Sequence, residues 1–369
     1  MPVNIGLAQL SDHFLLGTVV FYALGMLAFA GDFAYGRTPR RRPAAVAATA
    51  GSVRVAVPAA ATASAALGSA GPAPSAARAA PPGDGAGGTI DGPADAAVGT
   101  GWTVAASRWR AGGAPAGRWV RAALAFTALG LVAHVAGILT RGLAEDRVPW
   151  GNMYEFVTAI TCAAVIAFLL LCIRFRIYSL GLFVMAPVVL GLGLCATVLY
   201  TAAGPLVPAL HSYWIWIHVT AMTLAIGSFI VAAVLTTMYL VADRYARRPA
   251  AGTGTGFGAI LQRLPGADAL DRLSYRTVIF AFPIWTFGII AGAIWADQAW
   301  GRYWGWDPKE TWAFISWVVY AGYLHARATA GWRGHRAAYI QLLGFTTLLF
   351  NLVGVNLWIT GLHSYAGIN

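Results

Sequence analysis

The sequence predicts an all-α, polytopic integral membrane protein with about eight transmembrane helices. Of its 369 residues, 58% are hydrophobic and only 11% are charged. The apolar residues gather in long runs, which are typical of membrane-spanning helices rather than of a soluble core. The net charge of +11 would suit a nucleic acid partner, but its distribution fits membrane topology instead, so no nucleic acid is expected.

Eight apolar runs are long enough, at about 20 residues each, to cross a bilayer. They lie near residues 12–31, 119–140, 153–173, 178–200, 213–241, 277–296, 311–328 and 337–360. The first run, within residues 1–36, is expected to stay in the membrane, because its arginines follow the apolar stretch whereas those of a cleaved signal peptide precede it. Residues 37–118 are rich in Ala, Gly and Pro and are expected to form a disordered cytosolic linker.

The positions of Lys and Arg predict the orientation. With the N-terminus outside, the cytosolic segments are 32–118, 174–177, 242–276 and 327–336. Together with the helical turn beside them they contain 21 of the 25 Lys and Arg residues. The outer segments keep only Arg141, Arg147, Arg302 and Lys309. Both termini are therefore expected outside.

Residues 300–312, WGRYWGWDPKETW, contain four tryptophans and lie outside in this topology. The segment also predicts a helix start, because Asp307 and Glu310 are spaced as a capping box with Pro308 between them. Large rigid rings separated by glycines can line a slot for a flat apolar ligand such as a porphyrin. An interfacial aromatic belt is the alternative, but it would scatter the tryptophans singly around the helix ends.

Histidine is the usual neutral axial ligand of porphyrin iron. His218, near the outer start of the fifth run, and His363, after the last run, lie on the same side as the tryptophan loop. The tetrapeptide LHSY occurs at 210–213 and again at 362–365, so His211 is a rival ligand. Position alone leaves each of these histidines open between an iron ligand and an interfacial polar residue.

Two further histidines fall inside predicted helices. His325 lies towards the cytosolic end of the seventh run, and a histidine there is costly enough to suggest a function. It lies about half a membrane thickness from the outer pair, so it would belong to a second, inner site. His134 has no aromatic neighbourhood in the sequence and is expected to be a hydrogen-bonded packing residue.

The segment AIWADQAWGRYWGWDPKETWAFISWVVYAGYLHAR, residues 293–327, resembles the tryptophan-rich WWD domain of haem-handling cytochrome c biogenesis proteins. Among these it is similar to the CcsA/ResC family of system II, often called CcsB in actinobacteria. PWGNMYE at 149–155, SYWIWIHV at 212–219 and GVNLWITGLHSYAG at 354–367 match as well. The resemblance covers most of residues 119–369 and places the external WWD loop at 295–312.

The resemblance implies a component of a holocytochrome c synthase, or cytochrome c haem lyase. Such a subunit takes haem b from the cytosolic side of the plasma membrane and presents it outside. There the haem is joined to the CxxCH thiols of apocytochrome c. A CcsB/ResB-type membrane partner is expected, together with a thiol-reducing, thioredoxin-like protein.

The resemblance also assigns site residues. It makes His218 and His363 the ligands of an external haem iron, in preference to His211, and His325 a ligand of a transmembrane haem iron. A second ligand for the inner haem is expected from the partner. The remaining haem-binding residues are Trp300, Trp304, Trp306, Asp307 and Trp312. No catalytic residue is expected, because the chemistry needs positioning rather than a nucleophile from this chain.

Two other functions would use similar features. An electron-carrying cytochrome b-like protein explains the histidines but not an external tryptophan-rich loop. A polytopic transporter or glycan polymerase is the second alternative. Charged residues are scarce within the predicted helices, which argues against an ion-coupled carrier.

Overall fold

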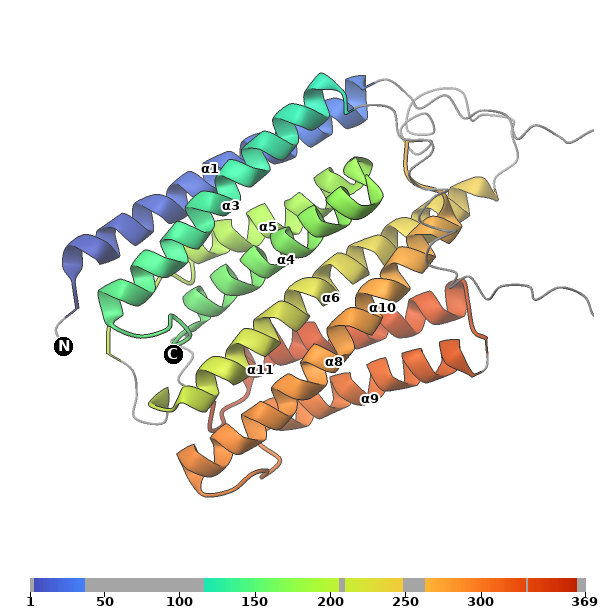
Figure 1. Cartoon of the computed structure of the whole chain (residues 1–369). Coiled ribbons are helices and arrows are strands. Elements are labelled where there is room, and N and C mark those ends of the chain that lie inside the picture. Colours follow the sequence, from blue (N-terminus) through green and yellow to red (C-terminus); the bar gives the residue numbers. More distant parts are fainter. Residues whose placement is uncertain (1–2, 37–115, 206–209, 248–262, 330, 364–369) are drawn as a thin grey trace, which may run out of the picture. The chain divides into compact units, whose positions relative to one another are not determined.

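The computed structural model describes residues 3–36, 116–205, 210–247, 263–329 and 331–363, all within one compact unit. The predicted linker lies almost wholly outside these residues. In the described part the regular elements are helices and there is no strand, so the predicted all-α class is confirmed (Figure 1). The helices are α1 (Ile5–Tyr35), α3 (Arg118–Glu145), α4 (Met153–Phe175), η1 (Tyr178–Leu180), α5 (Gly181–Thr197), α6 (Tyr213–Ala246), α8 (Ala267–Trp300), α9 (Pro308–Ala328), α10 (His335–Leu349), the π-helical turn η3 (Phe350–Gly354) and α11 (Val355–Trp358).

Seven helical segments of the described part are long and apolar enough to cross a membrane. They are α1, α3, α4, η1 with α5, α6, α8, and α10 continued through α11. Helix α9 coincides with the remaining predicted run. It is 21 residues long, but His325 and Arg327 near its end make it less apolar than the others. The prediction of about eight membrane helices is confirmed.

Local capping fixes the helix starts that surround the candidate site. The Asn152 side chain accepts a hydrogen bond from the Glu155 amide at 2.9 Å and caps α4, and Ser212 caps α6. Asp307 and Glu310 form the predicted capping box at the start of α9, with Pro308 at its first position. Gly301 ends α8 with φ of 70°, a left-handed conformation that glycine adopts without steric cost.

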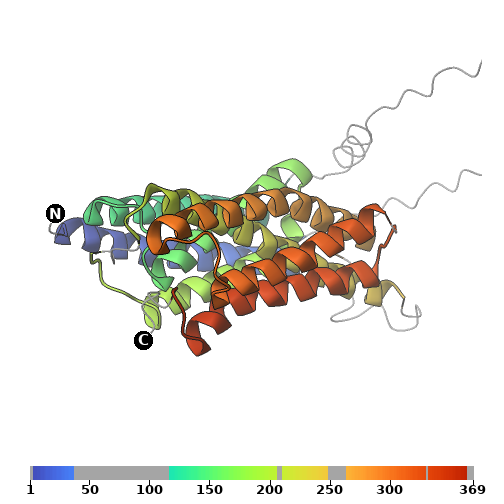
Figure 2. The same ribbon diagram turned by 90° about the horizontal axis from the view of Figure 1, so that it is seen from below.

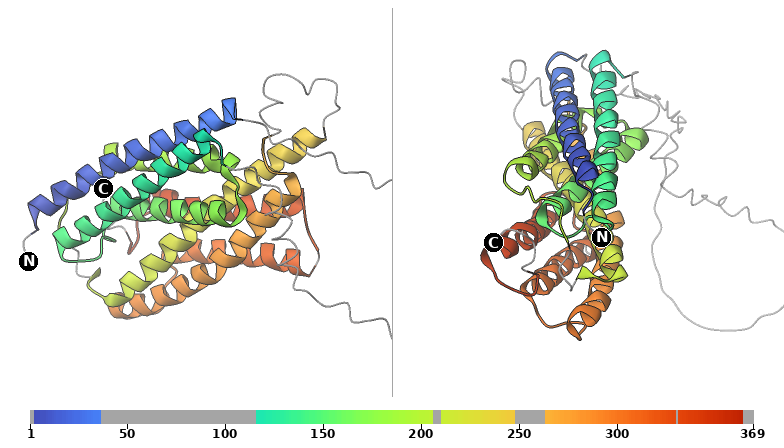
Figure 3. Two further views of the ribbon diagram at one scale, coloured as in Figure 1. Left: turned by 45° about the horizontal axis from the view of Figure 1, so that its top comes forward. Right: turned by 90° about the vertical axis from the view of Figure 1, so that its left-hand side faces the viewer.

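Helices α1, α3, α4 and α5 pack together, and α6, α8, α9 and α10 form a neighbouring group (Figures 1 and 3). Contacts between α4 and α6 join the two. Figure 2 shows α9 and α10 side by side in the second group. Gly227 of α6 lets its backbone approach α4, because an added Cβ would lie 2.7 Å from the Ala163 side chain. Small residues allow such close approach between membrane helices.

Successive helices run in opposite directions, so the loops gather at two ends of the helix group (Figure 1). At one end the Asn4 amide bonds the Ala144 carbonyl at 2.9 Å, and the Leu362 amide bonds the Asp307 carboxylate at 2.7 Å. At the other end Arg327 pairs with Asp271 at 2.7 Å. The tryptophan loop, the start of α6 and the end of the last helix therefore lie at the first end.

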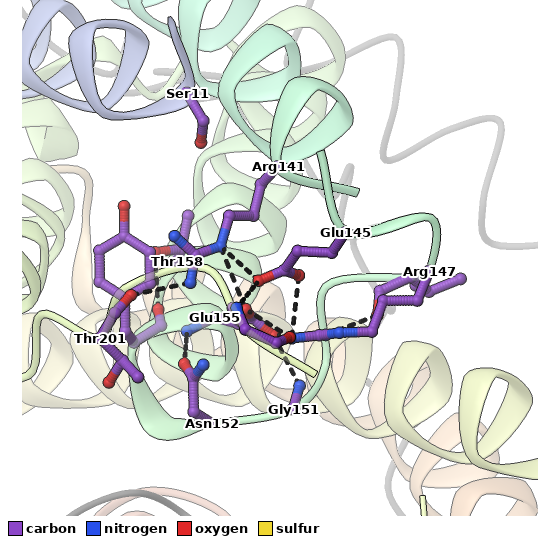
Figure 4. A network of polar contacts seen from close by, with 12 residues as sticks. Ser11, Arg141, Glu145, Arg147, Gly151, Asn152, Glu155, Thr158 and Thr201 are labelled. Atoms are coloured by element: carbon purple, nitrogen blue, oxygen red, sulfur yellow. Dashed lines mark hydrogen bonds and ion pairs between the residues drawn. The ribbon is translucent and has the colours of Figure 1, made fainter. Parts of the chain in front are cut away.

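A buried ion network also lies at this first end (Figure 4). Arg141 contacts Glu145 at 3.1 Å and Glu155 at 3.2 Å, and Arg147 contacts the same two carboxylates at 2.9 and 3.0 Å. Glu155 Oε2 also accepts the Gly151 amide at 2.6 Å. The network ties the end of α3 to the start of α4, whose Met153 and Phe156 line the candidate site.

Candidate functional site

A cavity lies among α4, α6, α8, α9 and the end of α10, with about 1100 Å³ of empty space, part of it open to solvent. Its walls are mostly apolar, with a small set of polar residues. This combination is typical of a ligand site, in which a few polar groups orient an apolar molecule. The lining residues that carry polar atoms or large rings include His218, His363, Trp285, Trp295, Trp300, Tyr303, Trp304, Lys309, Glu310, Asn351 and Asn356.

His218 is held against α8 by its Nδ1 atom, which donates to the Gly288 carbonyl at 2.7 Å. Its ring stacks on Trp295 with centroids 6.0 Å apart and planes 15° apart. Gly292 makes room for the ring, because a Cβ there would lie 2.6 Å from His218 Nδ1. A carbonyl can only accept, so the neutral imidazole carries its lone pair on Nε2. A metal-binding histidine typically has its other nitrogen fixed in this way.

His363 is fixed by a carboxylate. Its Nδ1 lies 2.7 Å from Asp307 Oδ2, and the adjacent Leu362 amide donates to Asp307 Oδ1 at 2.7 Å. Burial alone would raise the pKa of the Asp307 carboxyl, but the hydrogen bonds from His363 and Leu362 outweigh it, so that pKa is lowered. Asp307 therefore stays ionised at neutral pH and accepts the Nδ1 proton, which puts the lone pair of the neutral ring on Nε2.

The two histidines meet at one indole. The His363 ring packs edge-on against Trp295 at 5.6 Å and Trp300 at 5.0 Å, and Trp295 is the ring on which His218 stacks. Trp295 and Trp300 themselves are in edge contact at 4.8 Å. The structure thus brings both predicted external ligands and one predicted tryptophan to the wall of the same cavity.

The other predicted tryptophans divide between the cavity and elsewhere. Trp304 lines the cavity. Trp306 is 65% exposed and is not part of the cavity lining, although it contacts Trp304 and Phe314. Its φ of 59° turns the chain at this point. Trp312 packs on Phe350 at a centroid distance of 4.2 Å and also lies outside the lining.

His325 lies far from the cavity. It follows Lys309 by 16 positions on α9, which is about 24 Å along the helix axis. Its side chain is exposed, and it shares an outward stripe with Phe314, Val318 and Gly322. Because such a separation exceeds the reach of one iron, His325 can serve only a second site.

The remaining histidines have other roles. His134 is buried, and its Nδ1 lies 3.2 Å from the Tyr22 hydroxyl, as expected for a hydrogen-bonded packing residue. His211 is exposed and lies outside the cavity lining. No group of three or more His, Cys, Asp or Glu side chains among the described residues could hold a bare metal ion. Two imidazoles in an indole-walled cavity instead suit a metal that brings its own planar ligand, so the residues fit haem.

Sequence reasoning missed several cavity residues. Trp295 is 2% exposed and contacts both histidines, but it precedes the conspicuous cluster at 300–312 and lies within α8. Trp295 lies in the segment 293–327 that resembles the WWD domain, and this position could have identified it as a candidate. Asn351 also lines the cavity, and a polar residue inside an apolar membrane segment could have identified it.

Comparisons with known proteins agree with this architecture. The family model of the cytochrome C assembly protein matches residues 150–363. The cytochrome c biogenesis protein CcsA of Guillardia theta is 38% identical over 243 residues, which cover 62% of this chain and 80% of that protein. CcsA of Gloeobacter violaceus is 36% identical and CcsA of Chlamydomonas reinhardtii is 37% identical, over 83% and 65% of their lengths.

Among solved structures, the chain resembles the cytochrome c haem lyase CcmF, with a TM-score of 0.56 and 15% identity. The match covers 95% of this chain and 47% of CcmF, so this chain spans about half the length of that protein. At this identity the likeness concerns the fold alone.

Proposed function

The chain belongs to the cytochrome c assembly protein family, and on that premise we propose that it is the membrane subunit that presents haem for attachment to apocytochrome c. Its place in cytochrome c biogenesis follows from the family. The finer proposal is that it receives haem b from the cytosolic side of the plasma membrane. It then holds the haem in the indole-walled cavity on the extracytoplasmic face and yields it to a client CxxCH motif.

One observation carries this proposal. His218 and His363 come from distant parts of the chain, line one cavity, and each has Nδ1 engaged so that Nε2 carries the lone pair of the neutral ring. The acceptors, a backbone carbonyl and a carboxylate, are the usual partners of metal-binding histidines. Trp295 and Trp300 add flat apolar surface beside them.

The residues of this chain would hold and orient the haem and leave the covalent step to the client. Bound haem supplies the vinyl groups to which the client thiols add. The three cysteines, Cys162, Cys172 and Cys195, are buried within membrane helices, so they are poorly placed to take part. Positioning of this kind can lower a barrier substantially without a nucleophile from the enzyme.

His325 is proposed to belong to an inner haem site shared with another protein. It is exposed on a mostly apolar stripe of α9, and a polar group facing lipid is costly. A CcsB/ResB-type partner that covers this stripe would remove the cost and could supply the second iron ligand. A thioredoxin-like reductant would keep the client thiols reduced.

The test is an absorption spectrum of the purified full chain, with and without its partner, beside cytochrome c maturation in cells. His218→Ala or His363→Ala is expected to lose the bis-histidine spectrum and to abolish maturation while the protein still inserts. His211→Ala is the matched control, because its tetrapeptide is the same but it lies outside the cavity lining. Normal maturation in either cavity variant contradicts the ligand assignment.

Two further outcomes separate the alternatives. His325→Ala is expected to lower total haem content, because supply to the outer site passes through the inner one; full outer occupancy would refute that relay. A bis-histidine spectrum that apocytochrome c never depletes would instead favour a cytochrome b-like electron carrier.

A further inference from the structure

The cavity contains a polar corner that the iron ligands do not use. The Lys309 side chain enters it from the first turn of α9, and its Nζ donates to the Asn351 carbonyl at 2.7 Å. Asn351 lies in the π-helical turn η3, a feature that often marks functional sites. Asn351 as a whole is 8% exposed, and its Oδ1 has no hydrogen-bond partner.

The Lys309 ammonium group makes no direct ion pair with a carboxylate of the described residues. Asp307 acts on its charge only from a distance, although Lys309 borders an apolar cavity. The two nearby acids have other partners. Asp307 accepts from His363 and the Leu362 amide. Glu310 accepts the Gly305 and Asp307 amides at 2.8 and 3.0 Å. A cation in such surroundings gains most from a ligand that brings its own negative charge.

The other cation of the tryptophan segment 300–312 is differently placed. Arg302 lies 3.6 Å from Glu310 and is not part of the cavity lining. Arg302 and Lys309 therefore differ in the one property that matters here, access to the interior of the cavity.

We propose that Lys309 and Asn351 form a carboxylate subsite within the haem cavity. The inference rests on the proposed function, under which the carboxylate is a haem propionate. The ammonium donates to the propionate oxygens, and the Asn351 amide, turned with its NH₂ group inward, donates beside it. A propionate held by Lys309 and Asn351 would restrict how the bound haem turns in the cavity, and so would favour one position of its vinyl groups.

A charge cycle tests the subsite. Iron protoporphyrin IX and its dimethyl ester, whose propionates are neutral, are titrated into the full chain in detergent and followed by absorption. Esterification is expected to weaken binding to the wild type about 10- to 100-fold, as for a charge-assisted hydrogen bond. Lys309→Met should weaken binding of the acid by a similar factor and abolish the difference between the two porphyrins. Arg302→Met, the matched control, should keep the full difference.

The cycle can overturn the proposal. If Lys309→Met binds the ester as the wild type does but still prefers the acid by the wild-type factor, Lys309 does not contact a propionate. If wild-type chain binds both porphyrins equally, with a His218-dependent spectrum, the subsite is wrong and the proposed function stands. If the wild type binds neither porphyrin, the proposed function itself fails.

A second measurement needs no variant. Lys309 is the only lysine of the chain, so a haem propionate activated as its N-hydroxysuccinimide ester meets a single side-chain amine. An amide bond to Lys309, with loss of N-hydroxysuccinimide, should add the porphyrin mass to the tryptic fragment 303–327. Labelling of the N-terminal amine alone, in a sample whose spectrum shows bound haem, overturns the proposal.

Discussion

His218 and His363 each use Nδ1 to fix the ring, but they use different acceptors. A carbonyl holds His218, whereas the Asp307 carboxylate holds His363. A carboxylate partner makes an imidazole more basic and a stronger ligand. If both bind iron, the His218 bond is therefore the weaker one, and His218 is the ligand that a client histidine would displace more readily.

Asp307→Asn tests this difference. The amide oxygen can still cap α9 and accept one hydrogen bond, but the negative charge beside His363 is lost. Haem affinity is expected to fall about 10- to 100-fold, the usual cost of losing such a partner, and the iron potential to rise. Both are measured by titration of the full chain. Unchanged affinity and potential would show that Asp307 only caps the helix.

Gly292→Ala tests the seat of His218. The new methyl carbon would lie 2.6 Å from His218 Nδ1, so the ring must move and its bond to Gly288 must break. Haem affinity is expected to fall about tenfold or more, as for other losses of an orienting contact. Gly193→Ala, in a helix where the added methyl meets nothing within 4 Å, is the control. Equal affinity in both variants would contradict the geometry.

The sequence pattern predicted some of the site residues but not the side-chain geometry of others. Histidines are rare and chemically distinctive, so position made His218 and His363 candidates beside the rival His211, and only the family resemblance preferred the first two. The side-chain direction of Trp306 depends on a left-handed backbone at that residue, which no spacing rule predicts. The meeting of Lys309 with Asn351 joins residues 42 positions apart through a π-helical turn, and spacing in the sequence does not predict its geometry either.

At the scale of helices, hydropathy located the segments but not their ends. Helix α8 runs from Ala267 to Trp300. Its first residue lies ten positions before residue 277, where the predicted run began. The extra turns carry Asp268, Asp271 and Arg272, so an apolar-run criterion stops short of them. Those turns place Asp271 beside Arg327 of α9. Capping motifs, by contrast, predicted the start of α9 correctly, because a cap is a local interaction.

The ion network between α3 and α4 yields an element-scale prediction. Glu155→Gln removes one of two carboxylates that balance Arg141 and Arg147 (Figure 4). Breaking a buried pair typically costs about 3 kcal/mol, so the free energy of unfolding in detergent should fall by about that amount. Arg247→Gln, in an exposed pair at the C-terminal end of α6, should leave stability unchanged. Equal effects of the two substitutions would argue against a structural role for the network.

At the scale of the whole molecule, the antiparallel course of the helices decides where function can lie. The candidate haem site and the Arg141 network share one end, and most arginines belong to segments that lead to the other end. Because positive residues favour the cytosolic side, the cavity is predicted to open outside. This prediction needs both the distribution of arginines and the position of the loops. Neither of them alone determines the side of the membrane to which the cavity opens.

Cysteine labelling on intact cells tests this orientation. Tyr303 is 60% exposed in the tryptophan loop, and Trp332 is 38% exposed in the loop between α9 and α10. The native cysteines are buried, so they give a low background. Tyr303→Cys should react with a membrane-impermeant maleimide from outside, whereas Trp332→Cys should react only after permeabilisation. The reverse pattern would place the cavity in the cytosol, where it could not present haem to an exported client even if both histidines bind iron.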